Sequence, residues 1–431
     1  MYHVALRKVG RRAEVAEVFR QEALGWAESL HQALGSQPPD VSWDACLFAR
    51  CWLRLPSIKP GHHLLAWTKY LRDTLPELAE EQDFWADGRW SGLPVTQALA
   101  FCNGFLAELW LAEPTDTMTK STIQATARFL LEAGNDDLPW FDHETGLFRG
   151  LVLGSGAFSS LAEINLPLHF DAINLALLAY QTGGGRKYLD VASMAGCYWS
   201  DAILRRRQLP LAIDSKGPIW KPNRSVREAY ATMRSLPPEN RLQQAAAFLR
   251  ADAVNTFLKL WQYRGDESFR HAAEYLIDCL LPMLSAPGSW QTAATLRHYR
   301  NFTGSSRYDG VVLAEVENLF PYWIKTLSLT LRSSVNEDDS PRYPVWFENG
   351  IPRQHNPVLL SLAAEISANE RLAVSALNLA LAYFRLARLA SASVSDYSLA
   401  PASVTTIAAG DWLNRRVGVV NEILRPALST A

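Results

Sequence analysis

Residue types suited to acid–base chemistry gather in four polar stretches of this 431-residue chain. The first stretch, 134–146, carries Asp142, His143 and Glu144 directly after Trp140 and Phe141. Cleavage of a glycosidic bond needs two carboxyl groups, one of them kept protonated by an apolar setting. A carboxylate beside Trp and Phe has that setting, so Asp142 is a candidate acid. The alternative is an ordinary solvated turn whose aspartates cap backbone groups.

The second stretch places His169 and Asp171 where a helix is predicted to begin, just after Pro167. Side chains and free backbone N–H groups at a helix start face the space beyond the helix. His169 could therefore act as an acid or base near neutral pH. The alternative is a capping aspartate beside a hydrogen-bonded core histidine.

The third stretch, 300–310, places Arg307, Tyr308 and Asp309 in a loop before a helix that carries Glu317. A tyrosine can donate a proton, and an arginine can clamp a carboxylate. A plain turn ending in Asp-Gly is the alternative.

The fourth stretch, 343–355, offers Glu348 and His355 with Trp346, again before a predicted helix.

Tryptophan is abundant, with fifteen copies, and six of them fall outside the helical stripes. A loop tryptophan beside polar groups can stack on a sugar ring, or it can simply plug the end of a wide helical ring. The residues predicted to bind substrate are Trp85, Trp90, Trp140, Phe141, His143, Trp220, Arg307, Trp346, Glu348 and His355.

The elements that must position these residues are predicted to be helices. Apolar residues recur at helical spacing from Arg12 to Leu34, and the stripe ends at Gly35 before Pro38 and Pro39. Only 146–154 has the composition of a strand or hairpin arm. Similar helical patterns cover 43–54, 61–75, 93–112, 117–133, 169–182, 186–205, 240–263, 266–284, 312–332, 357–367, 370–391 and 405–424.

A faint internal repeat places some of these helices in pairs. The segment from Asn174, with Tyr-Gln-Thr-Gly-Gly-Gly-Arg-Lys-Tyr-Leu-Asp, matches the segment from Asn255, with Gln-Tyr-Arg-Gly-Asp-Glu-Ser-Phe-Arg-His-Ala, at one offset. In each copy a helix is predicted to end at a glycine, and an aromatic in the next helix packs back on the turn. A poorer third copy begins at Ile366.

These hairpin segments resemble the six-hairpin glycosidase-like superfamily. The resemblance implies an all-α fold, an (α/α)6 toroid in which a closed double ring of helical hairpins carries long irregular loops at one end. We expect one domain over 1–431, with the loops at 76–92, 134–168, 206–239, 285–311 and 334–356. Members are mostly glycoside hydrolases, polysaccharide lyases and epimerases, and the implied site is the funnel that the loops surround.

The leading functional expectation is a carbohydrate-active enzyme, hydrolase or lyase, using acid–base catalysis. A cofactor-free cyclase, dehydratase or isomerase of an isoprenoid-like substrate is one alternative, and a non-enzymatic helical scaffold is another. The loops 134–171, 300–309 and 343–356 are predicted to converge on one cavity. The predicted catalytic residues are Asp142, His169, Asp171, Tyr308, Asp309 and Glu317.

Composition sets the expected partners and compartment. The net charge is −2 and no long run of like charges occurs, so nucleic acid and anionic membranes are not expected partners. We expect a small-molecule or oligosaccharide substrate and no cofactor or metal, and the sequence allows a homo-oligomer. The five cysteines are predicted to be buried free thiols. The absence of a signal-like start favours the cytoplasm.

Overall fold

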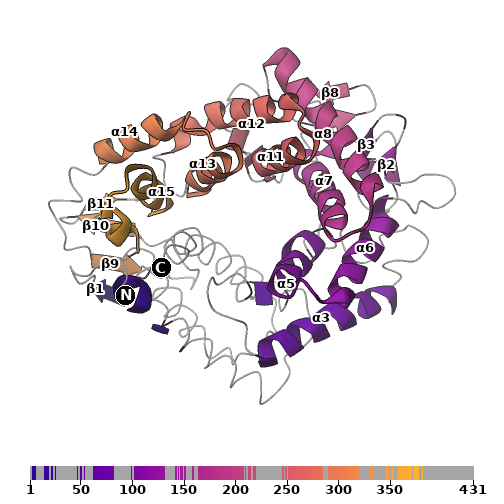
Figure 1. The fold of residues 1–431 in the computed structure, drawn as a ribbon, viewed down its shortest axis with the longest axis horizontal. Coiled ribbons are helices and arrows are strands. Elements are labelled where there is room, and N and C mark those ends of the chain that lie inside the picture. The colour runs from indigo at the N-terminus through magenta and orange to yellow at the C-terminus, as the bar shows by residue number, and fades with distance from the viewer. Residues whose placement is uncertain are drawn as a thin grey trace. The chain divides into compact units, whose positions relative to one another are not determined.

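The computed structural model is mostly helical, which confirms the all-α prediction (Figure 1). Among its described helices none is both long and apolar enough to cross a membrane. The described residues are 2–5, 14–18, 21–22, 25, 46, 49–50, 53, 62–81, 99, 101–131, 141–142, 144, 146–148, 150–151, 158–159, 164–207, 209, 212–214, 217–219, 245–246, 248–249, 251–284, 290–319, 330–333, 345–348, 351–353, 357–370, 372–377 and 381.

The chain divides into two compact units. Unit 1 joins Met1–Leu71 to Met283–Ala431, and unit 2 is the continuous segment Arg72–Pro282. Helix α3 (His62–Glu81) crosses the boundary between them. The single-domain organisation stays a prediction.

Unit 2 is built around two helical hairpins. Helix α7 (Leu166–Gln181) pairs with α8 (Arg186–Arg206), and α11 (Ala253–Arg264) pairs with α12 (Glu267–Leu280). Helix α8 packs on α12 and α7 contacts α11, so corresponding helices of the two copies are neighbours (Figure 1). The predicted repeat is therefore confirmed as two hairpins that stack in the same order. The π-helix η2 (Phe101–Leu106), α5 (Ala107–Ala112) and α6 (Thr117–Leu131) precede them, and η2 and α6 both pack on α7.

Left-handed residues end the first helix of each hairpin, as the glycines predict. Gly183 and Gly265 have φ of 93° and 72°, a region that costs glycine little. A Cβ on Gly184 would lie 2.7 Å from Cε2 of Tyr188, so this aromatic does pack back on the turn. Asp266 then caps α12 by accepting a hydrogen bond from the Ser268 N–H at 2.9 Å.

The third copy shows the same arrangement in unit 1. Helix α15 (Pro357–Ser367) ends at Ala368, whose φ is 50°. The Asn369 side chain then accepts a hydrogen bond from the Leu372 N–H at 3.3 Å. An alanine in this backbone region carries more strain than a glycine, and the third copy lacks the glycine that marks the turn in the other two.

A close approach of helices α8 and α11 depends on Gly196. A Cβ there would lie 2.4 Å from Cδ1 of Leu260 and 3.2 Å from Cε1 of Phe269. The absence of a side chain lets α8 pack directly against the second hairpin.

A cluster of aromatic rings forms the centre of unit 2. Trp199 is fully buried, as its place on a helical stripe predicts. It packs at 5.5 Å from both His169 and Phe170, measured between ring centroids. Phe170 in turn contacts Phe248 and Phe257. The rings fill the space between α7, α8 and α11, so this cluster is core.

Short strands interrupt the helices of unit 2. Strand β2 (Phe141–Asp142) pairs with β3 (Leu147–Phe148), and β4 (Gly150–Leu151) pairs with β5 (Phe158–Ser159). The predicted hairpin arm at 146–154 is confirmed in β3 and β4. A further antiparallel sheet follows the order β6 (Ile164–Asn165), β7 (Ala212–Asp214) and β8 (Gly217–Ile219).

Unit 1 contains a four-stranded antiparallel sheet that the sequence did not predict. Its order is β1 (Tyr2–Ala5), β9 (Thr330–Ser333), β10 (Val345–Glu348) and β11 (Ile351–Arg353). The predicted helix 312–332 is wrong at its end. Helix α14 (Asp309–Leu319) is shorter, and the residues from Thr330 pair with β1 instead.

Helix α13 (Trp290–Thr303) is a second correction, because 285–311 was expected to be an irregular loop. Its buried side includes Thr292, Thr295 and Arg297, so polar residues occupy positions where an apolar stripe would have revealed a helix.

A third correction concerns Cys197. This thiol is exposed, whereas Cys46 and Cys102 are buried as predicted.

Candidate active site

The half-buried Asp171 lies in the second turn of α7 and is joined to the neighbouring η2. The Asn103 side chain donates a hydrogen bond from Nδ2 to the Asp171 carbonyl oxygen at 2.7 Å. The Oδ1 atom of Asn103 is buried and accepts no hydrogen bond from any described residue. A buried acceptor without a partner costs free energy, and π-helical turns such as η2 are frequent at functional sites.

A second carboxylate, that of Asp252, stands at the start of α11. Asp252 is exposed, and its φ of 56° is left-handed, which is uncommon for a residue other than glycine. It occupies the N-cap position without capping a backbone N–H through its side chain. Its Oδ1 instead accepts a hydrogen bond from Asn255 Nδ2 at 2.6 Å. Strained backbone held by local hydrogen bonds is typical of functional positions.

A side-chain hydrogen bond connects the middle of α7 to the first turn of α11. The Thr256 hydroxyl contacts Asn174 Oδ1 at 3.0 Å and the Asp252 carbonyl at 2.9 Å. Asn174 lies one turn after Asp171 on the same side of α7. The polar row thus joins η2 to α7 through the Asp171 carbonyl oxygen, and α7 to α11 through Asn174 and Thr256. Asp171 and Asp252 are the two acidic residues of this row.

Two carboxylates and three amides in one row can exchange protons and hydrogen-bond hydroxyl groups. Part of this row could be expected from the sequence, because Asn174 and Asn255 are matched positions of the repeat. Asp252 had no such signal, since it fell inside the predicted helix 240–263.

The predicted acid–base residue His169 is fully buried between aromatic rings. Its Nδ1 accepts a hydrogen bond from the Trp199 indole N–H, which assigns the proton of the neutral ring to Nε2. The backbone N–H of Phe148 lies 3.4 Å from Nε2. With the proton on Nε2, these two nitrogens are both donors, so they form no hydrogen bond with each other. Burial lowers the pKa of His169 to about 3. These observations favour the core-histidine alternative over a base near neutral pH.

Asp142 lies at the turn of the β2–β3 hairpin. Its Oδ1 accepts the Glu144 N–H at 2.9 Å, and its carbonyl accepts the Gly146 N–H at 2.8 Å. Phe141 is buried and packs edge-on against Phe148 at 5.1 Å. This is the geometry of an aspartate-capped turn, the alternative already described for this stretch.

The predicted residues of the third stretch lie in unit 1 around the start of α14. Tyr308 is buried edge-on against Tyr299 at 5.2 Å, and the exposed Arg307 lies over the Tyr308 ring. Asp309 accepts a hydrogen bond from Arg300 at 3.3 Å. Glu317 is exposed, two turns further along α14. Arg307, Tyr308 and Asp309 therefore share one local cluster, and the prediction that the loops converge stays a prediction.

A buried ion pair extends this cluster to α15, and the sequence did not point to it. Arg297 contacts both carboxylate oxygens of Glu365, Nη2 to Oε1 at 2.9 Å and Nε to Oε2 at 3.2 Å. The Ser361 hydroxyl contacts Oε1 at 3.3 Å. Burial raises the pKa of Glu365, and the charge of Arg297 opposes that rise. The pair holds α13 against α15.

Several predicted substrate-binding residues lie outside the described residues. These are Trp85, Trp90, Trp140, His143, Trp220 and His355. Trp346 and Glu348 are described only as backbone in β10. Where the structure describes side chains, no three His, Cys, Asp or Glu residues gather as metal ligands.

The chain matches no protein-family model, no curated protein and no solved structure.

Proposed function

We propose that the chain is a carbohydrate-active enzyme, of the glycoside hydrolase or polysaccharide lyase type, and that it is built as an (α/α)6 toroid. The observation that carries this proposal is the polar row with Asp171 and Asp252. Asp252 stands directly before α11, and Asp171 lies in the second turn of α7, so both carboxylates are nearer the N-terminal than the C-terminal ends of the first helices of the two hairpins.

The chemistry follows from the two carboxylates. Asp171 is half-buried and follows His169 and Phe170 of the aromatic cluster, and we assign it the role of acid. Asp252 is exposed and its Oδ1 accepts a hydrogen bond from Asn255, and we assign it the role of base or nucleophile. The half-buried amide of Asn174 is suited to bind a sugar hydroxyl.

The isoprenoid-cyclase alternative needs ring faces that line a cavity and stabilise a carbocation. The described rings of Phe170, Trp199, Phe248 and Phe257 pack against one another instead. No described observation therefore favours the cyclase alternative over the carbohydrate-active enzyme.

The test is a panel of oligosaccharides and uronic-acid polymers with two readouts. New reducing ends without ultraviolet absorbance indicate hydrolysis, and absorbance from a new double bond indicates elimination. Asp171→Asn is expected to lower turnover by ~100- to 10,000-fold with little change in melting temperature. The matched control is Asp201→Asn, since Asp201 is exposed on α8 and pairs only with Arg205 there. Full turnover by Asp171→Asn, or no turnover of any panel member by the unmodified chain, would contradict the proposal.

A further inference from the structure

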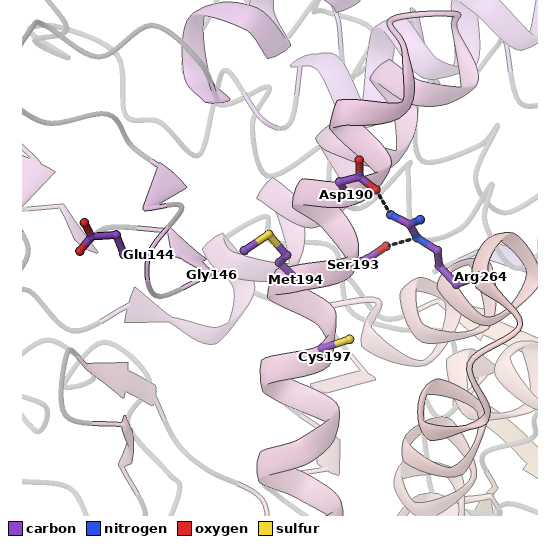
Figure 2. A pocket seen from close by; sticks show the side chains of 7 residues that line it. All are labelled: Glu144, Gly146, Asp190, Ser193, Met194, Cys197 and Arg264. Atoms are coloured by element: carbon purple, nitrogen blue, oxygen red, sulfur yellow. Dashed lines mark hydrogen bonds and ion pairs between the residues drawn. The ribbon is translucent and has the colours of Figure 1, made fainter.

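Helix α11 carries two cationic side chains in different surroundings. Arg264, at its end, lines an open depression on α8, where it donates a hydrogen bond to Ser193 Oγ at 2.7 Å and pairs with Asp190 (Figure 2). Its charge therefore joins the two hairpins. Lys259 is half-buried in the middle of the helix and makes no ion pair with any residue that the structure describes.

Two hydrogen bonds between α7 and α11 fix where Lys259 lies. The Thr256 hydroxyl contacts Asn174 Oδ1 at 3.0 Å, and further along the helix the Tyr263 hydroxyl accepts a hydrogen bond from Gln181 Nε2 at 2.9 Å. Lys259 follows Thr256 by three residues and precedes Tyr263 by four, so it lies beside these contacts, between their two levels. It therefore continues the polar row along α11.

The internal repeat shows that the hairpins do not need this charge. Asn174 of α7 matches Asn255 of α11, and at the same offset Lys259 matches Leu178. Leu178 is buried, so the copy in α7 packs with an apolar side chain at this position. The ammonium group of Lys259 is thus available for another role.

A half-buried ammonium group without an anionic partner is unfavourable. Removing part of a charge from water costs free energy, which an ion pair can offset. Asp252, the acidic residue of the row on the same helix, precedes Lys259 by seven residues, ~10 Å along the axis, and forms no ion pair with it. An anionic group of a ligand would supply the missing partner.

We propose that Lys259 binds the carboxylate of a uronic-acid unit in an oligosaccharide. The position of the reacting bond, beside Asp171 and Asp252, rests on the proposed function. The ~10 Å of helix between Asp252 and Lys259 is longer than one sugar ring. The uronic acid that Lys259 recognises is therefore a neighbour of the sugar at the reacting bond, and the substrate class is an acidic oligosaccharide.

Calorimetric titration of the full chain carrying Asp171→Asn tests binding without turnover. The probes are trimers of galacturonic, glucuronic and mannuronic acid, each compared with its methyl ester, which removes the charge. At least one acid is expected to bind about tenfold more tightly than its ester, as a charge-assisted hydrogen bond allows. The proposal is overturned if no acid binds better than its ester, or if a sulfated neutral trimer binds more tightly than every acid.

Variants of Lys259 assign the preference to this side chain. Lys259→Gln is expected to abolish it and Lys259→Arg to keep most of it, both at unchanged melting temperature. Lys187→Gln is the control, because it removes the charge of an exposed lysine of the same unit, which lies over the Tyr188 ring on α8. A preference that survives Lys259→Gln, or that Lys187→Gln removes equally, would overturn the role of Lys259.

Turnover separates this inference from the proposed function. With Asp171 intact, Lys259→Gln is expected to raise KM for the acid about tenfold and to leave kcat almost unchanged, because a contact away from the reacting bond contributes equally to ground and transition states. A tenfold loss in kcat instead would overturn the position of Lys259 away from that bond. Binding of the acids without turnover of any of them would contradict the proposed function and support the Lys259 site. Turnover of neutral oligosaccharides alone would support the proposed function and overturn the Lys259 site.

Discussion

Acidification is expected to destabilise unit 2 through His169, because this histidine is held neutral in the folded chain. Its pKa falls from an ordinary value of 6.5 to about 3 on burial. Below pH 6.5 the unfolded chain therefore binds a proton at this position and the folded chain does not. The stability is fully present above pH 6.5 and is lost progressively as the pH falls toward 3.

The magnitude follows from the width of that interval. Each pH unit below 6.5 costs ~1.4 kcal/mol of unfolding free energy. At a pH of about 4.5 the loss from His169 alone is therefore ~3 kcal/mol. That is a substantial share of the ~5–15 kcal/mol by which folded domains are stable.

The assay is urea unfolding of the unmodified chain and of His169→Asn, compared near pH 7 and near pH 4.5. Asparagine keeps an acceptor for the Trp199 indole N–H but does not titrate. The stability advantage of the unmodified chain over this variant is expected to shrink by ~3 kcal/mol between the two conditions. His271→Gln is the control, because His271 is exposed on α12. A difference between the chain and His169→Asn that does not change with pH would refute the reasoning.

Three further predictions concern packing, charge and the β2–β3 turn. Gly196→Ala is expected to cost ~1–3 kcal/mol, because its Cβ would overlap Leu260, and Leu260→Val in the same chain should recover part of the lost melting temperature. Arg297→Met is expected to cost ~2–4 kcal/mol in urea unfolding, because it leaves the Glu365 carboxylate without its partner. Replacing Glu365 by Leu as well should restore most of that loss, and an equal loss in both variants would contradict it. Asp142→Ala is expected to lower stability by ~0.5–1.5 kcal/mol through the lost Glu144 N–H bond, whereas a large loss of turnover at unchanged melting temperature would return Asp142 to the catalytic candidates.

Local signals explain what the sequence predicted correctly. The hairpins α7–α8 and α11–α12 were predictable because a glycine with positive φ ends each first helix, and this requirement is visible in one residue. Helix α13 was missed because Thr292 and Arg297 occupy its buried side, and Arg297 is tolerated there only through Glu365 on another helix. That partner lies far along the chain, so no local pattern reveals it.

The same limit applies to the sheet of unit 1 and to the candidate site. Strand β9 was read as the end of a helix, because its partner β1 is at the other end of the chain. Asp171 was identified because a proline and a histidine mark the start of its helix. Asp252 was not identified, since the left-handed break before α11 has no glycine to announce it.

The division of unit 1 between the two ends of the chain has a consequence for biosynthesis. Strand β1 leaves the ribosome before unit 2, yet its partner β9 belongs to the segment made after unit 2. At ~5–20 residues per second, the 324 residues between Ala5 and Thr330 take on the order of 16 to 65 s to make. Unit 2 is continuous, so it can complete its hairpins during that interval, while the unpaired edge of β1 must be kept from other strands. Chaperones that act on nascent chains would therefore be needed at β1 until β9 has been made.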